Sequence, residues 1–125
     1  MKRWLLAFLF ILPSVAATIS LNSINQEAYS AGDKVTISGY LIEEQNTWGT
    51  LQFDLECEEK LPLLLRAVNV IQGEKIQFSE DLSIPLAQTG QCFILVSLLT
   101  GSTVIDQSET EPFDISNELL GEFSL

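Results

Sequence analysis

Apolar and polar residues alternate over much of the chain after residue 17. In Val35–Leu41 and Leu51–Cys57 the odd-numbered positions are mostly apolar and the even-numbered positions mostly polar. A period of two places successive side chains on opposite faces of a β-strand, so each segment is predicted to bury one face. Other segments with strand character are Thr18–Ile24, Leu63–Val70, Lys75–Ile84, Gln91–Leu99, Thr103–Gln107 and Pro112–Ser116, the last expected to continue the one before it.

Turn-forming residues separate these segments. Glycine-containing turns fall at residues 31–33, 46–49, 72–73, 89–90 and 100–102, and no helical period of useful length is present. Short strands at a spacing of about ten residues are typical of stacked antiparallel sheets. The pattern therefore predicts an all-β antiparallel β-sandwich of about seven strands.

The segment Gln91–Leu99 departs from the alternation. Residues 92–96 are all apolar, so Phe93 and Leu95 are expected to point away from the core and to require a cover on the second face. Two interpretations are open. Either Val104 or Ile105 on a neighbouring strand shields them, or they form an interaction face on which another chain or domain docks.

Residues 1–17 have the layout of a secretory signal peptide. Lys2 and Arg3 provide a positive start, residues 4–12 form an apolar run, and Ala17 ends a small-residue cleavage site. The run is too short to span a bilayer as an ordinary helix, and no later segment is long enough. We expect a signal peptide over 1–17, one domain over 18–116, and a tail or linker over 117–125 that could begin a second module. The mature chain is expected to be secreted, extracellular or in the cell envelope, without a membrane span.

The two cysteines are expected to form a disulfide. Export to an oxidising compartment favours a bridge between Cys57 and Cys92 over a metal site or a nucleophile. An antiparallel pairing with these residues opposed also aligns three apolar pairs on one inward face, Leu55 with Ile94, Phe53 with Val96 and Leu51 with Leu98. Closing a loop of about 36 residues would stabilise the fold by roughly 3–4 kcal/mol. The alternative is two buried, reduced thiols.

Charge and residue usage exclude several classes of function. The chain has six basic and seventeen acidic residues and a net charge of −11, which disfavours nucleic-acid binding because phosphates would be repelled. It contains no histidine, the commonest general base and a frequent zinc ligand, and no glycine-rich phosphate loop. We therefore expect no catalytic residues, no cofactor and no metal site, and we do not expect an enzyme.

Two features could nevertheless contact a ligand. Four acidic residues gather near the end of one predicted strand: Asp54, Glu56, Glu58 and Glu59. Calcium takes several carboxylate oxygens, but a solvated strand face and turn is the favoured interpretation. Trp48 lies in the 46–49 turn, where it could stack on a sugar ring together with Tyr40 and Phe93, or fold back over the end of the sandwich.

The stretch from Tyr29 to Gly39 reads Tyr-Ser-Ala-Gly-Asp-Lys-Val-Thr-Ile-Ser-Gly. It resembles the opening of immunoglobulin-like modules of bacterial and archaeal extracellular surface proteins, in which Tyr-x-x-Gly-Asp/Glu-x-Val-x-Ile-x-Gly recurs. The closing Phe113-Asp114-Ile115 is also similar to that family. Two departures are Ala31, where proline is commoner, and a cysteine pair expected to join neighbouring strands of one sheet.

The resemblance implies an immunoglobulin-like β-sandwich in which Tyr29 packs over one end. It also implies a structural or interaction module of a cell-surface or envelope protein, with an unidentified protein partner or a neighbouring domain. The alternative is a carbohydrate-binding accessory module, in which Trp48 and nearby carboxylates contact a glycan.

Overall fold

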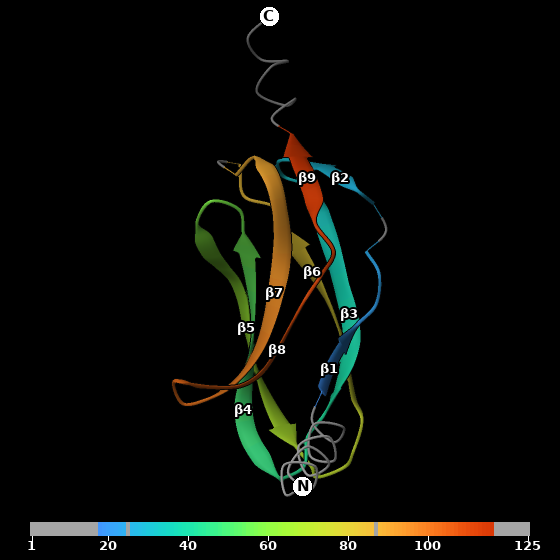
Figure 1. The fold of residues 1–125 in the computed structure, drawn as a ribbon, viewed down its shortest axis with the longest axis vertical. Coiled ribbons are helices and arrows are strands. Elements are labelled where there is room, and N and C mark those ends of the chain that lie inside the picture. Colours follow the sequence, from blue (N-terminus) through green and yellow to red (C-terminus); the bar gives the residue numbers. More distant parts are fainter. Residues whose placement is uncertain (1–17, 25, 87, 117–125) are drawn as a thin grey trace, which may run out of the picture.

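The computed structural model describes residues 18–24, 26–86 and 88–116, which form two β-sheets stacked as a sandwich (Figure 1). The strands in these residues are β1 Thr18–Leu21, β2 Ala28–Ser30, β3 Lys34–Ile42, β4 Thr47–Glu56, β5 Lys60–Val70, β6 Ile76–Ser83, β7 Gly90–Thr100, β8 Thr103–Glu109 and β9 Phe113–Ser116. The smaller sheet has the order β1-β3-β6. The larger has the order β2-β9-β7-β4-β5, with β8 also paired to β7. The predicted all-β sandwich is confirmed, whereas the expected signal peptide and the 117–125 tail lie outside the described residues.

The described residues contain nine strands rather than about seven, and one pair is not antiparallel. Strand β2 has only three residues and pairs with β9 in parallel, with Ala28 opposite Asp114. Three residues are too few for the alternation to be recognised in the sequence. At the other end of the chain, β8 and β9 pair with successive parts of β7, so β9 continues β8 along the same strand as expected.

The alternation correctly predicts which side chains form the core. In β3 the residues Val35, Ile37 and Leu41 are buried, and the inward residues of β4 and β7 are fully buried as well. The observed β4–β7 register sets Leu51 opposite Leu98, Phe53 opposite Val96 and Leu55 opposite Ile94, as the apolar pattern predicted. This register holds because a shift of one residue would turn Gln52 and Glu56 toward the core.

Polar contacts and aromatic packing close the margins of the sandwich. Arg66 of β5 forms an ion pair with Glu80 of β6 and so connects the two sheets along one edge. At one end, the ring of Tyr29 packs edge-to-face on Phe113 with centroids 5.2 Å apart, as the resemblance implied. Among the described residues, no helix is long and apolar enough to cross a membrane.

The turn before β3 explains the glycine in the motif. Gly32 has a φ of +91°, a backbone conformation that residues with a side chain rarely adopt. The Asp33 carboxylate accepts the main-chain N–H of Ser30 at 2.8 Å, and the Asp33 N–H donates to the carbonyl oxygen of Ser30 at 3.0 Å. Ala31 donates its main-chain N–H to the carbonyl oxygen of Ser116 at 3.4 Å, and a proline at position 31 could not make this bond because it has no N–H.

Candidate functional site

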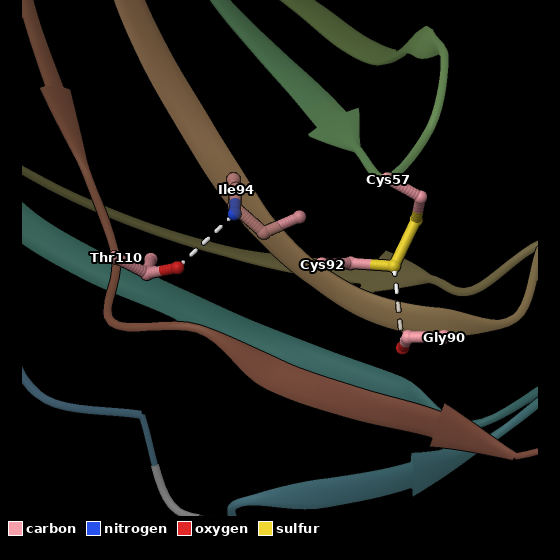
Figure 2. The surroundings of a disulfide bond; sticks show 5 residues. All are labelled: Cys57, Gly90, Cys92, Ile94 and Thr110. Carbon is pink, nitrogen blue, oxygen red and sulfur yellow. Dashed lines mark hydrogen bonds between the residues drawn. A yellow bond between two sulfur atoms is a disulfide. The ribbon is translucent and has the colours of Figure 1, made fainter.

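The predicted disulfide between Cys57 and Cys92 is confirmed. Cys57 follows the last residue of β4 and Cys92 lies in β7, with sulfurs 2.04 Å apart and Cα atoms 4.3 Å apart (Figure 2). The bridge joins neighbouring strands of the six-stranded sheet, next to the register pair Glu56–Phe93. It therefore fixes the end of β4, where the chain turns towards β5, to the central strand of this sheet.

Thr110 secures the junction between β8 and β9 near the disulfide. Its side chain is buried, and its hydroxyl oxygen accepts the N–H of Ile94 at 3.0 Å (Figure 2). The hydroxyl donates to the carbonyl oxygen of Glu111 at 3.0 Å, and the Thr110 N–H donates to the Ile94 carbonyl oxygen at 3.0 Å. These bonds keep the edge of β7 paired through the break between the two strands.

We define the outer face as the side of the six-stranded sheet turned away from the three-stranded sheet. The register places these apolar side chains on it: Trp48, Pro62, Leu65, Ala67, Phe93, Leu95, Leu99 and Val104. Phe93 and Leu95 are half-buried, while Leu65 is 62% exposed. Val104 lies opposite Leu99, so it sits towards the other end of β7 from Phe93. The outer face therefore combines apolar side chains of β5 and β7 with a polar row on β4 between them, formed by Thr50, Gln52, Asp54 and Glu56.

The prediction that Asp54 is solvated is wrong. Asp54 is on the outer face but only 1% exposed, between its register partners Pro62 in β5 and Leu95 in β7. The side-chain amide of Gln52 donates to both of its carboxylate oxygens, at 2.8 and 3.1 Å. The β4–β5 register shifts between Phe53 and Asp54, and this irregularity was not visible in the sequence.

The other acidic residues of that group do not converge on a common site. The carboxylate oxygen Oε2 of Glu56 lies 3.9 Å from Nζ of Lys60. Glu58 and Glu59 are exposed in the turn after β4. In the part of the chain that the structure describes, no three Asp, Glu or Cys side chains lie close enough to hold a metal ion together.

Trp48 is the second residue of β4 rather than a turn residue, and it is 72% exposed. It pairs with Asn69 at the start of β4, whereas Phe93 pairs with Glu56 at the opposite end of the same strand. Tyr40 belongs to the other sheet, where the Lys75 ammonium group lies 4.4 Å from its ring centroid. The three aromatic residues therefore do not form one platform, and Trp48 is the exposed aromatic side chain among them.

The structure brings together a pair of acidic side chains that was not identified from the sequence, Glu43 and Asp106. Glu43, immediately after β3, is 5% exposed and adjoins the carboxyl group of Asp106 in β8. Burial raises the pKa of Glu43 to about 7, and the negative charges of Asp106 and Glu44 act in the same direction. The signal for Glu43 was present, since it occupies the next inward position after Val35, Ile37, Gly39 and Leu41.

Comparisons with known proteins identify the fold and not a family. No protein-family model matches the sequence, and no curated protein matches it. A β-glucosidase from Listeria innocua, whose structure contains glucose, is similar with a TM-score of 0.57 and 13% identity, over 80% of this chain and 16% of that one. A β-glucuronidase of glycoside hydrolase family 2 gives a TM-score of 0.57 and 16% identity, over 81% of this chain and 11% of that one.

The sporulation control protein Spo0M from Bacillus subtilis is similar as well, with a TM-score of 0.55 and 14% identity. That match covers 81% of this chain and 49% of Spo0M. This chain therefore spans less than half of the length of each of these three proteins. It is a β-sandwich that resembles domains found within glycoside hydrolases, and its disulfide hints at an oxidising, extracytoplasmic environment.

Proposed function

We propose that this chain is an exported immunoglobulin-like module that serves a cell-surface or envelope protein as a structural or interaction unit, without catalysis. The observation that carries the proposal is the set of leucine side chains in contact with solvent on the outer face of the six-stranded sheet, Leu65, Leu95 and Leu99. The disulfide, the Tyr29–Gly39 motif and the similarity to domains within larger proteins support it.

The composition of the outer face favours docking. Leu65, Leu95 and Leu99 come from two strands that flank β4, and all three retain contact with solvent. Large apolar side chains in contact with solvent can mark an interaction site, since burying them removes unfavourable hydration. Gln107, which is exposed and donates to the Ser97 hydroxyl at 3.2 Å, lies among these side chains and would give the contact a defined orientation.

The path of the chain also suits a module within a longer assembly. Thr18, at the start of β1, pairs with the last residue of β3, whereas Ser116 in β9 lies beside the turn that begins β3. The first and last described residues are therefore at opposite ends of the long axis (Figure 1). This arrangement allows modules to follow one another in a row.

The docking role is tested by photo-cross-linking in the native envelope. A photoreactive amino acid replaces Leu95 on the outer face or Ser79 on the exposed face of the smaller sheet, as a matched control. We expect a discrete cross-linked species from position 95 alone, and we expect a second substitution on the same face, Leu99→Lys, to abolish it while the circular dichroism spectrum stays unchanged. Equal cross-linking at both positions, or none at position 95, would contradict the proposal.

A second candidate, glycan binding, is favoured by the exposure of Trp48. A flat, solvent-exposed indole can stack on a sugar ring, and the only other tryptophan is Trp4 within residues 1–17. In a chain that lacks those residues, the tryptophan fluorescence therefore reports Trp48 alone. A saturable change during a glycan titration would favour this role, with binding lost in Trp48→Ala when measured by calorimetry. Flat traces across a broad glycan panel would refute it.

A further inference from the structure

The buried carboxyl group of Glu43 meets the half-buried side chain of Asp106 between the end of β3 and strand β8. Glu43 is 95% buried, and the carboxyl group of Asp106 lies within hydrogen-bonding reach of it. Glu43 Oε2 and Asp106 Oδ2 are both buried, and neither accepts a hydrogen bond from any protein group. Carboxylate oxygens only accept hydrogen bonds, so two ionised groups cannot satisfy each other. Something positively charged, or a proton, has to lie between them.

A pocket opens beside this pair. It has a volume of about 300 Å³ and is lined by Glu43, Glu44, Gln45, Asn46, Thr47 and Ile105. Five of these six residues carry a side-chain oxygen, and none of the six is basic. The loop that forms the pocket is held in place, because Gly73 donates its N–H to the Glu43 carbonyl oxygen at 2.9 Å and Gln72 donates to Asn46 Oδ1 at 2.7 Å.

We propose that Glu43, which lines this pocket, and the adjoining Asp106 bind a hard divalent cation, calcium or magnesium. The donors are oxygens only, the chain has no histidine, and both cysteines are in the disulfide, so the site suits a hard ion rather than zinc. The two carboxylates supply up to four oxygens. Water and oxygens of the surrounding loop complete the coordination shell.

The number of charged ligands sets the strength of the site. Because no three acidic side chains among the described residues lie close enough to hold an ion together, the affinity is expected to be in the range of extracellular calcium modules, about 10⁻⁴–10⁻³ M. Such a site would be filled outside the cell, where these ions are abundant, and would tie the loop after β3 to β8. The ion would therefore join the smaller sheet to the larger one.

The test compares thermal unfolding of the full chain in a chelator, in calcium and in magnesium at neutral pH. An ion that binds the folded state and not the unfolded state raises the melting temperature. The rise is about 10 °C or more when the ion concentration is a hundred times its Kd. We expect this shift in the unaltered protein and its loss in Glu43→Gln and Asp106→Asn, which keep the side-chain shape. Calorimetric titration should give one ion per chain, and the ion that gives the larger shift identifies the natural ligand.

A charge-matched control separates specific binding from screening of the negative surface. Glu58→Gln removes the same charge at an exposed position and should retain the full ion-dependent shift. Equal shifts in Glu43→Gln and Glu58→Gln would overturn the proposal in favour of general charge screening. No shift in the unaltered protein would also overturn it, and would leave a proton shared between the two carboxyl groups as the explanation of the pair.

Discussion

Removing the disulfide provides a quantitative test of the fold. The double variant Cys57→Ala, Cys92→Ala deletes a bridge between residues 35 positions apart. A cross-link of this span restricts the unfolded chain and is worth about 4 kcal/mol in the chain-entropy model. Domains of this size are stable by about 5–15 kcal/mol, so the variant should lose a large share of its stability.

Equilibrium unfolding in urea, followed by far-ultraviolet circular dichroism, measures this loss. For a domain of about 100 residues, 4 kcal/mol corresponds to a drop in melting temperature of about 15–30 °C. The dependence of the unfolding free energy on urea should also become steeper, because the uncrosslinked chain exposes more surface when it unfolds. The folded spectrum should not change, since the register between β4 and β7 is also fixed by three apolar pairs.

Two results would refute this reasoning. A loss below about 1 kcal/mol would mean that the bridge does not restrict the unfolded chain as the entropy model requires. If the intact protein is stable by well over about 4 kcal/mol, a variant that fails to fold in the absence of denaturant would mean that the bridge specifies the register, which we assign to side-chain alternation. Thiol titration of the unaltered protein in denaturant, before reduction, is the control and should find no free thiol.

Three further substitutions test local features. Gly39→Ala should lower the free energy of unfolding by about 2 kcal/mol, because the added methyl group would overlap the carbonyl oxygen of Ser20 in β1. An unchanged midpoint of urea unfolding would contradict this close approach. Thr110→Val should lower the free energy of unfolding by about 1–3 kcal/mol, because the Ile94 N–H loses its hydrogen-bond acceptor. A loss below about 0.5 kcal/mol, which is typical of a neutral surface substitution, would show that the fold does not need this bond. A double-mutant cycle on Arg66 and Glu80 should give a coupling energy of at most about 1 kcal/mol, because the Arg66 side chain is 48% exposed and the pair is screened by solvent. This coupling should fall with added salt, and a larger coupling that does not depend on salt would contradict the screening.

The core and the disulfide could be predicted from the sequence because two independent signals agree there. Alternation in the Leu51–Cys57 and Gln91–Leu99 segments specifies the inward faces, and setting the single cysteine of each segment opposite the other points to the same register from the sequence. A wrong register would have set polar residues against the core. Strand β2 gave no such signal, since a three-residue strand is shorter than the pattern that reveals strands.

The polar sites were harder to predict because they depend on irregularities and on long-range contacts. Asp54 is buried beside a register shift within the β4–β5 pair, whereas the alternation of β4 alone places it in solvent. Glu43 was predictable in part, since extending the alternation of β3 by two residues turns it inward. Its contact with Asp106 was not, because the pairing of β7 with β8 has a register shift between Leu98 and Leu99 of β7.

Mass spectrometry of the protein isolated from its own host tests most directly the claim that this chain works as an exported, disulfide-closed module. Digestion without reduction should yield a mature amino terminus at Thr18 together with one peptide pair joined through Cys57 and Cys92. An intact Met1 together with both cysteines as free thiols would contradict the account, because an unprocessed and reduced chain would not have left the cytoplasm.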